Sequence, residues 1–381
     1  MPPKPLGLLA NFADMAQHTD YAGEAAGLLS SLIGIPSHSR EEGAAADFLQ
    51  GWMEGRGIAT HRLGNNTWSL SQDYDPGRPT LLLNAHIDTV KPAAGWTRDP
   101  YTPTIENGRL YGLGSNDCGG GLVALLQAFR MLQGAGLPFN LVYLASAEEE
   151  VSGSGGISAV LEEWAAKPGM PRIDAALVGE PTCMQPAVAE RGLVVVDLEA
   201  RGRSGHAARG EGLNAIYMMV DDIAWLRDHR FQRVSTLLGP ATATVTVVNA
   251  GTQHNVVPAL CRAVVDVRPN ELYTNEEIVG IISEHTRCQA TPRSLRLRPS
   301  GIDPAHPLAA ACTGRPGKTP FGSPTLSDQA LMPFPSVKMG PGDSSRSHTA
   351  DEYVLSSEIS QAIGEYADII RSITHLPRHN P

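Results

Sequence analysis

The stretch that most constrains the fold is residues 80–90, TLLLNAHIDTV. Residues 80–83 form a short apolar run, which predicts a strand buried on both faces, and such strands belong to parallel sheets covered by helices. His86 and Asp88 then fall at the carboxyl end of this strand. Ligands of open α/β sheets bind at that edge, and an imidazole oriented by a carboxylate is a common metal ligand. On this stretch alone, a surface histidine beside an aspartate is an equally good interpretation.

Acidic side chains follow two further strand candidates. Residues 140–146, NLVYLAS, run into an acidic triplet at 148–150, and residues 174–178 are followed by Glu180. Because acids also favour helix N-termini, a solvated helix start is the alternative for the triplet. The carboxyl ends of parallel strands meet at one edge. We therefore expect these acids to lie near His86.

Asp117 and His348 add one more carboxylate and one more imidazole. Asp117 precedes three glycines, 119–121, and a strongly apolar helical pattern over 122–133. The segment lacks both the Walker lysine and the spacing of a dinucleotide fingerprint, so a metal-binding carboxylate fits better than a phosphate loop. His348 follows a strand candidate at 336–339.

The combined set has the nitrogen and oxygen donors that catalytic zinc sites use. Two ions that share a carboxylate can bind an attacking water between them, and one further carboxylate must stay unligated to move the proton. Glu149 is left for that task. The candidate metal ligands are His86, Asp117, Glu150, Glu180 and His348.

The chain length of 381 residues predicts two domains. From about Arg191 the pattern changes to β-α-β-β-α-β, with its last strand expected at 294–298, and this order describes a ferredoxin-like split unit. We predict an α/β fold whose mixed, largely parallel sheet has helices on both faces. Residues 1–187 and 299–381 would form this catalytic domain, and residues 188–298 would be the inserted α+β domain.

Charge and cysteine content bear on the partners and the cellular compartment of the protein. The formal net charge of -10 disfavours nucleic acid as a partner, because phosphate binding needs a basic surface. The five cysteines are odd in number and lack CxxC spacing, which suits a reducing compartment and supports neither a disulfide scaffold nor a thiolate zinc site. We expect no signal peptide and no membrane span, and hence a cytoplasmic protein.

In their order along the chain, the motifs resemble the co-catalytic di-zinc amidohydrolases. This family includes acetylornithine deacetylase, succinyl-diaminopimelate desuccinylase, aminoacylase and glutamate carboxypeptidase, and acetylornithine deacetylase is the most similar member. The resemblance covers nearly the whole chain and rests on HID, GSND, AEEE, GEPT, SGHA, NVVP and GPGDSSRSHTADEY. Any one of these motifs alone would be weak.

The resemblance implies two divalent metal ions, with zinc expected first and cobalt as an option. His86, Glu180 and Asp117 would hold one ion, and Glu150, His348 and Asp117 the other. Ligands of this kind also suit manganese, so the sequence does not fix the metal.

The resemblance also implies catalytic roles and a dimer. Asp88 would orient His86, and Glu149 would be the general acid and base. The inserted domain would be the lid and dimerisation domain of a homodimer, and His206 would reach across the dimer to stabilise the oxyanion.

Substrate residues follow from the same matching. The α-carboxylate of a substrate is well bound by the guanidinium group of an arginine, which can donate two hydrogen bonds to it. Arg191 and Arg268 lie at positions resembling the family's carboxylate-binding arginines, with Asn255 beside them. Surface arginines in salt bridges are the alternative. Thr325, in the SPTLSDQ loop, is expected to line the side-chain pocket, although small polar residues in such loops also form turns.

Two positions depart from the family's pattern. Many members have a basic or other polar residue where Cys118 stands, and a buried neutral thiol is our interpretation there. The acidic triplet leaves a register ambiguity, because the family usually shows one acidic residue followed by two glutamates. We align Glu148 with the first and treat Glu149 and Glu150 as the working pair.

The implied activity is hydrolysis of the amide bond of a small N-acyl-L-amino acid, with N-acetyl-L-ornithine deacetylation in arginine biosynthesis expected first. The GSPTLSDQALM and GPGDSSRSHTADE stretches look like a bacterial subgroup acting on N-acetylcitrulline or on N-succinyl-citrulline or -ornithine; succinyl-diaminopimelate is a further option. A di- or tripeptidase or a carboxypeptidase with the same site is the second class. A non-catalytic interaction protein is the third, and the intact ligand set with Glu149 argues against it.

Overall fold

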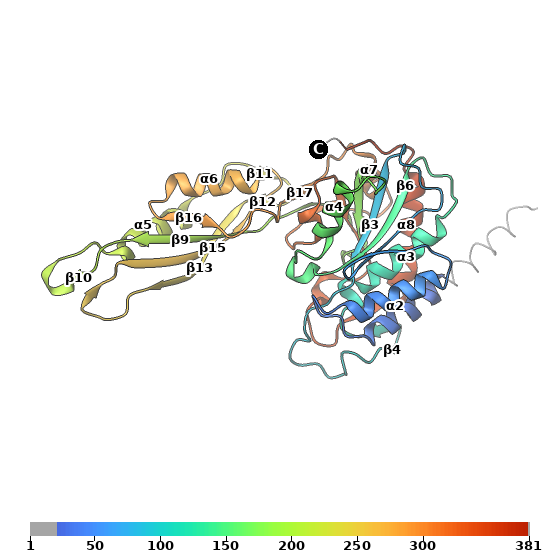
Figure 1. Ribbon diagram of the computed structural model, residues 1–381, viewed down its shortest axis with the longest axis horizontal. Helices are drawn as coiled ribbons and strands as arrows, with labels where there is room; N and C mark the ends of the chain where they lie inside the picture. Colours follow the sequence, from blue (N-terminus) through green and yellow to red (C-terminus); the bar gives the residue numbers. More distant parts are fainter. Residues whose placement is uncertain (1–20, 380–381) are drawn as a thin grey trace, which may run out of the picture. The chain divides into compact units, whose positions relative to one another are not determined.

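The computed structural model describes residues 21–379, which form two compact units (Figure 1). Among these residues, the first unit holds the chain up to Val188, then Ile302–Pro320, and then the chain from Met332 onwards. The second unit holds Ala189–Gly301 together with Phe321–Leu331. The sequence pattern had not grouped residues 321–331 with the insertion, because they stand apart from it along the chain.

A mixed sheet forms the centre of the first unit. The strands β6, β3, β7 and β19 run parallel to their neighbours within this group, whereas β1 and β2 pair antiparallel and so do β2 with β6 and β8 with β19. The prediction of a mixed, largely parallel α/β sheet is confirmed. Across the sheet, the order is β1 (His61–Leu63), β2 (Asn66–Leu70), β6 (Asn140–Ser146), β3 (Thr80–His86), β7 (Ala175–Val178), β19 (Ser336–Lys338) and the start of β8 (Ala187–Glu190).

Helices cover both faces of this sheet. Trp164 of α4 (Ile157–Ala166) packs edge-to-face on Trp68 of β2, with ring centroids 5.7 Å apart, on the face opposite the main core. The main core contains side chains from the helix at residues 21–33 and from α2 (Gly43–Glu54), α3 (Gly120–Met131), α7 (Pro307–Thr313) and α8 (Ser356–Ser372).

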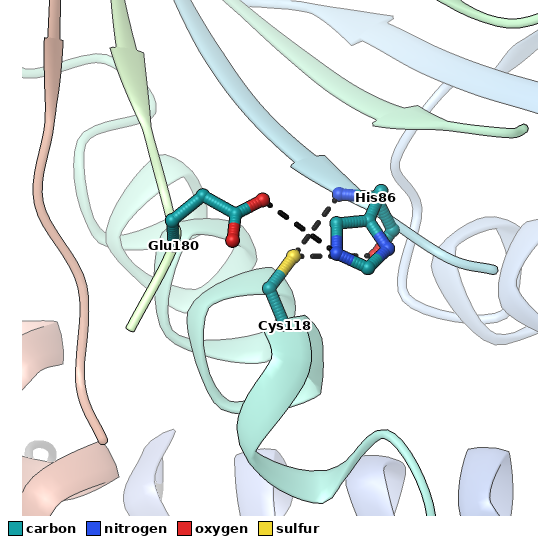
Figure 2. Close-up of side chains that lie close together, drawn as sticks. All are labelled: His86, Cys118 and Glu180. Carbon is teal, nitrogen blue, oxygen red and sulfur yellow. Dashed lines mark hydrogen bonds and ion pairs between the residues drawn. The ribbon is translucent and has the colours of Figure 1, made fainter. Parts of the chain in front are cut away.

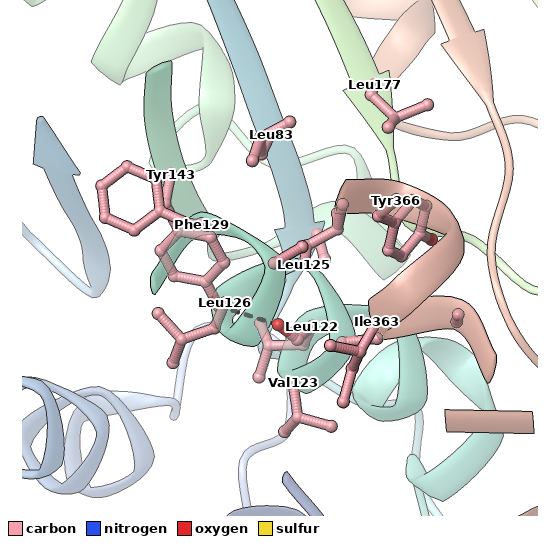
Figure 3. Close-up of a cluster of buried hydrophobic side chains, with 14 of the residues drawn as sticks. Leu83, Leu122, Val123, Leu125, Leu126, Phe129, Tyr143, Leu177, Ile363 and Tyr366 are labelled. Atoms are coloured by element: carbon pink, nitrogen blue, oxygen red, sulfur yellow. Dashed lines mark hydrogen bonds between the residues drawn. The ribbon is translucent and has the colours of Figure 1, made fainter. Parts of the chain in front are cut away.

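The centre of the core lies between the parallel strands, α3 and α8 (Figure 3). Leu83 of β3, Leu177 of β7, Phe129 of α3 and Tyr366 of α8 are fully buried. Burying one Leu or Phe side chain contributes about 1.5–3 kcal/mol. The carboxyl ends of these strands are therefore anchored in a well-filled core.

A small antiparallel sheet brings the C-terminal part of the chain back to the region before α3. It consists of β4 (Thr104–Glu106), β5 (Arg109–Tyr111) and β20 (Tyr353–Leu355). Because β20 pairs with β5, Glu352 lies beside the loop that precedes α3, and the Gly112 N–H donates to the Glu352 backbone oxygen at 3.1 Å.

The second unit contains the predicted β-α-β-β-α-β arrangement. Its antiparallel sheet has the order β13-β15-β9-β16, and Figure 1 shows α5 and α6 packed along it. The alternating side chains Val194, Val196 and Leu198 of β9 are buried. In chain order the elements are β9 (Val194–Arg201), α5 (Ala215–Asp228), β13 (Thr242–Ala250), β15 (Leu260–Arg268), α6 (Asn275–His285) and β16 (Gln289–Pro292).

The last strand of this unit was predicted at 294–298, and that prediction is wrong. The strand is Gln289–Pro292, which pairs with β9. The Asn275 side-chain amide donates to the carbonyls of Leu295 and Leu297, at 2.9 Å each. These carbonyls are tied to the start of α6, so the alternating residues that follow β16 do not continue the ladder.

Two short strands, β17 (Ser300–Gly301) and β18 (Phe321–Ser323), pair with β8, and the other short strands of the second unit pair with one another in its loops. None of the helices formed by residues 21–379 is both long enough and apolar enough to span a membrane. The other short strands are β10 (Gly205–His206), β11 (Val234–Ser235), β12 (Gly239–Pro240) and β14 (Val256–Val257).

Candidate functional site

The candidate metal ligands and Glu149 all lie in the first unit, at the carboxyl edge of its parallel strands. His86 is the last residue of β3 and Glu180 follows β7. Glu149 and Glu150 come after β6. The remaining two ligands come from loops: Asp117 from the one before α3, and His348 from the one between β19 and β20.

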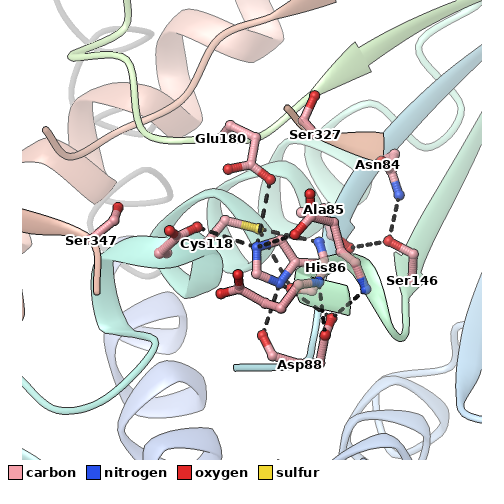
Figure 4. A network of polar contacts seen from close by, with 12 residues as sticks. Asn84, Ala85, His86, Asp88, Cys118, Ser146, Glu180, Ser327 and Ser347 are labelled. Atoms are coloured by element: carbon pink, nitrogen blue, oxygen red, sulfur yellow. Dashed lines mark hydrogen bonds and ion pairs between the residues drawn. The ribbon is translucent and has the colours of Figure 1, made fainter. Parts of the chain in front are cut away.

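His86 faces three of these carboxylates. Its Nε2 atom lies 3.3 Å from Asp117 Oδ1. The same atom lies 3.5 Å from Glu180 Oε1 (Figure 4). The same nitrogen is 4.0 Å from Glu149 Oε2. The imidazole is almost fully buried, at 2% exposure. An ion held by His86, Asp117 and Glu180 would therefore have Glu149 close by.

His348 faces the other side of Asp117. Its Nε2 atom lies 3.0 Å from Glu150 Oε2 and 3.4 Å from Asp117 Oδ2. Asp117 thus presents Oδ1 to one imidazole and Oδ2 to the other. A carboxylate placed in this way can bridge two ions, as in other two-metal sites.

The charges of the site favour cations. Burial raises the pKa of Glu180 to about 8 in the metal-free protein. The hydrogen bond to Glu150 raises the pKa of His348 to about 9. The shift of Glu180 reflects burial and that of His348 reflects its acidic neighbours Glu150 and Asp117, and a site of this kind favours bound positive charge. The donors are imidazole nitrogens and carboxylate oxygens, which fit two zinc or cobalt ions.

Asp88 fixes both His86 and the acidic turn. The His86 Nδ1 atom lies 2.8 Å from the Asp88 backbone oxygen and 3.4 Å from its Oδ1, which leaves Nε2 to face the ligand carboxylates. The Asp88 carboxylate accepts the backbone N–H groups of Glu149 at 3.0 Å and Glu150 at 3.1 Å, and the Ser39 hydroxyl at 2.7 Å. One buried carboxylate thus sets the positions of three site residues.

The three consecutive glutamates have different surroundings. Glu150 contacts His348, and Glu149 lies near His86. Glu148 instead accepts the Gly155 N–H at 3.2 Å and lies 3.8 Å from Arg40 Nε.

Asn116 joins the two loops that carry Asp117 and His348. Its side-chain amide is buried and donates to the Asp343 backbone oxygen at 3.0 Å and to the Ser347 hydroxyl at 3.1 Å. Ser347 is the residue before His348. The relative position of the two loops is therefore fixed by hydrogen bonds and not only by a metal.

Glu352 is a site residue that the sequence analysis missed. Its carboxylate is 2% exposed and accepts three backbone N–H groups, those of Gly114 at 3.1 Å and of Asn116 and Asp117 at 2.9 Å each. Burial raises the pKa of Glu352 to about 7. The residue stands within the quoted motif that contains His348, but spacing gives no sign that its partners are backbone groups of another loop.

Cys118 is buried, as predicted, with 1% exposure. Its Sγ atom accepts the His86 N–H at 3.2 Å and lies 3.5 Å from the His86 backbone oxygen. Burial raises the pKa of this thiol. His86, Cys118 and Glu180 converge on one small volume (Figure 2).

The other predicted residues lie in the second unit. His206 and Asn255 are neighbours, because β10 pairs with β14 and the Ala207 N–H donates to the Asn255 oxygen at 3.0 Å. His206 is exposed, and its Nδ1 accepts the Ala208 N–H at 3.2 Å. Thr325 Oγ1 lies 3.1 Å from Ser323 Oγ.

Both arginines have partners within the second unit. Arg191 donates to the backbone oxygens of Pro240 at 3.0 Å and of Arg268 at 3.2 Å, and also to that of Leu238. Arg268 forms a fork with Asp266, at 2.7 and 3.0 Å.

Solved structures with this fold are known. The aminopeptidase PepT of Bacillus cereus superposes with a TM-score of 0.71 at 17% identity, covering 92% of this chain and 98% of its own. A metallo-carboxypeptidase of Sulfolobus solfataricus gives 0.68 at 18%, covering 92% and 99%. The YXEP protein of Bacillus subtilis, a dinuclear metal-binding peptidase, gives 0.69 at 16%, covering 93% and 99%. At these identities the likeness concerns the fold.

The sequence itself gives the family. Residues 82–372 match the profile of peptidase family M20/M25/M40, and this match begins inside β3 and ends with α8. It therefore includes every candidate ligand described above. The chain belongs to peptidase family M20/M25/M40, a family of metal-dependent hydrolases.

Proposed function

We propose that this protein hydrolyses the amide bond of an N-acyl-L-amino acid at a two-metal site. N-acetyl-L-ornithine is the first candidate substrate, followed by N-acetyl- or N-succinyl-citrulline and by succinyl-ornithine or succinyl-diaminopimelate. The reaction type is inferred from the position of Asp117, whose two carboxylate oxygens lie near His86 and His348. Glu149 also lies near His86. The choice of substrate rests on the sequence motifs.

The proposed ligand sets are His86, Glu180 and Asp117 for one ion and Glu150, His348 and Asp117 for the other. When bound, two such ions would lower the pKa of water towards neutrality and polarise the substrate carbonyl.

Glu149 is the proposed general acid and base. It would accept the proton of the attacking water and return it to the leaving amine. Two features support this role: Oε2 lies 4.0 Å from His86 Nε2, and the backbone N–H of Glu149 is held by Asp88.

The second unit is proposed to be the lid and dimerisation domain of a homodimer. His206 would stabilise the developing oxyanion of the partner protomer's site. The exposure of His206 supports a role towards another molecule. Arg191, Arg268, Asn255 and Thr325 are the proposed substrate-binding residues. Both arginines are paired within the second unit, Arg191 with three backbone oxygens and Arg268 with Asp266, so either would have to exchange these partners for a substrate carboxylate.

Peptide hydrolysis is the second candidate function. It is favoured by the similar structures, which are named as an aminopeptidase and a metallo-carboxypeptidase. Amine release from acetylornithine, acetylcitrulline, succinylated analogues and a panel of di- and tripeptides separates the two. Faster turnover of any peptide than of every acyl amino acid would reverse our choice.

The reaction type is tested by a matched pair of variants, Glu149→Ala and Glu150→Ala. We expect Glu149→Ala to lower kcat by about 10²–10⁴-fold, the usual contribution of a general acid or base, while two metal ions stay bound. Glu150→Ala should lose metal, because Glu150 contacts His348. The measurements are steady-state kinetics and elemental analysis of the purified proteins. Near-normal turnover of Glu149→Ala would refute the assignment.

A further inference from the structure

We propose that Cys118 supplies a sulfur ligand to the ion held by His86 and Glu180, so that this position selects thiophilic metals. The proposal rests on the metal centre proposed above and adds a donor to it. The structure places a His86 ring nitrogen, Cys118 Sγ and a Glu180 carboxylate oxygen within 4.8 Å of one another (Figure 2).

The end of β7 makes room for the thiol. The parallel pairing of β3 with β7 ends at Asn84 and Val178, where the Gly179 N–H donates to the Asn84 oxygen at 2.8 Å. The His86 N–H lies beyond that pairing, and Cys118 Sγ accepts it at 3.2 Å. The Cys118 sulfur thus accepts the N–H group that a longer β7 would have bound, and it lies next to the His86 imidazole.

Close packing of α3 against the end of β7 brings Glu180 to the same place. A Cβ atom on Gly121 would lie only 1.6 Å from the Gly179 backbone oxygen, so only glycine permits this approach. Gly121 is at the start of α3, three residues after Cys118, and Gly179 immediately precedes Glu180. The contact therefore sets the thiol and the carboxylate side by side.

The spacing of the donors suits one ion. Zinc binds sulfur at about 2.3 Å and nitrogen or oxygen at about 2.0–2.2 Å, so two donors on one tetrahedral ion lie about 3.5 Å apart. His86 Nε2 and Glu180 Oε1 are 3.5 Å apart. Cys118 is 1% exposed and the Glu180 side chain 12%, so the thiol is shielded from solvent, and its Sγ atom lies against the backbone of His86.

Ligation changes the chemistry of the position. The S–H bond of Cys118 breaks, a bond between sulfur and the metal forms, and the proton leaves to solvent. Thiolate is a soft ligand that favours zinc and cadmium over manganese. A hydrogen bond to the His86 N–H alone would not need sulfur, because a serine hydroxyl can accept the same group. The variant Cys118→Ser therefore separates a ligand from a structural hydrogen bond.

The test uses the full chain, stripped with a chelator and reloaded with Co²⁺. Thiolate bound to Co²⁺ gives a charge-transfer absorption in the near ultraviolet. We expect this band in the wild-type protein and its loss in Cys118→Ser, with the same cobalt content by elemental analysis. The matched control is Cys183→Ser, which removes an exposed thiol and should keep the band. The ratio of Cd²⁺ to Mn²⁺ affinity should fall by at least about tenfold in Cys118→Ser, because even residues that only orient metal ligands change metal affinity by about 10–100-fold.

Three results would overturn the proposal. Wild-type protein that binds cobalt without the band has no sulfur ligand, although its metal centre stands. If the band survives in Cys118→Ser and vanishes in Cys183→Ser, the sulfur ligand is Cys183 and not Cys118. If the wild-type protein binds no cobalt, that result contradicts both the proposed metal centre and the proposed function. Far-ultraviolet circular dichroism of both variants is the check that they are folded.

Discussion

A single buried carboxylate, that of Glu352, holds the loop that carries Asp117. It accepts the N–H groups of Gly114, Asn116 and Asp117, and none of these atoms is a metal ligand. The loop would otherwise leave these donors buried without partners, at a cost of about 1–3 kcal/mol each. Glu352 is therefore a positioning residue for Asp117, the proposed bridging carboxylate.

Glu352→Gln tests this role. The amide of Gln can accept through only one of its two heavy atoms, so we expect weaker metal binding, by about 10–100-fold, as for other residues that orient ligands. Competition with a metal chelator measures the affinity. The matched control is Asp351→Asn, because Asp351 accepts from Thr97 and Arg98 and not from the loop of Asp117. Unchanged affinity in Glu352→Gln would contradict the assigned role.

Some of these residues could be predicted and others could not, for a physical reason. His86 and Glu180 each follow an apolar run, and parallel strands deliver such residues to one edge. Glu352 belongs to no such pattern, because its partners are backbone groups that every residue possesses. The contact between Cys118 and His86 likewise could not be predicted from the sequence, because it depends on the residue at which β7 ends.

At the level of elements, the junction between α3 and β7 is the tightest constraint near the site. Gly121→Ala would push a Cβ atom into the Gly179 backbone oxygen, and backbone cannot yield as a flexible side chain can. We expect a loss of at least about 1–3 kcal/mol in the free energy of unfolding, the usual cost of overpacking. Urea unfolding curves measure it.

Gly27→Ala is the matched control for Gly121→Ala. Gly27 lies in the helix at residues 21–33, and a Cβ atom there would meet nothing within 4 Å. Alanine is a better helix former than glycine, so this variant should gain up to about 1 kcal/mol. Equal effects of the two substitutions would show that the junction tolerates movement.

Element boundaries show the limit of sequence patterns. The alternation over residues 294–298 is as good as that of a true strand, and yet the strand is Gln289–Pro292. The Asn275 amide donates to the carbonyls of Leu295 and Leu297, and these contacts hold the segment after β16 beside the start of α6. A tertiary hydrogen bond of this kind leaves no periodic trace in the sequence.

At the level of the whole molecule, metal should stabilise only the first unit, because all the proposed ligands lie there. Binding at 100 times the dissociation constant adds about 2.7 kcal/mol to stability. Trp225 lies in the second unit and the other tryptophans in the first, so Trp225→Phe isolates the fluorescence of the first unit. We expect zinc to raise the unfolding temperature reported by that variant. In wild-type calorimetry one transition should move and the other should stay. A joint shift would mean that the units unfold as one.

The proposed dimer makes a separate prediction at this scale. His206→Ala and Glu149→Ala should each be inactive. Mixed and reassembled, they form hybrid dimers in which the protomer with intact Glu149 receives His206 from its partner, so activity should return to a fraction of the wild-type value. Mixing each variant with itself is the control. If the mixture stays inactive while ultracentrifugation shows hybrid dimers, His206 does not act across the dimer.

The reach of Glu352 also bears on how the protein is made. Its carboxylate contacts Gly114, 238 positions earlier, and His348 meets Glu150 across 198 positions. During synthesis, Asp117, Glu150 and Glu180 are therefore made long before the residues His348 and Glu352 that contact this region. The proposed metal centre can therefore be assembled only after the last part of the chain has been made.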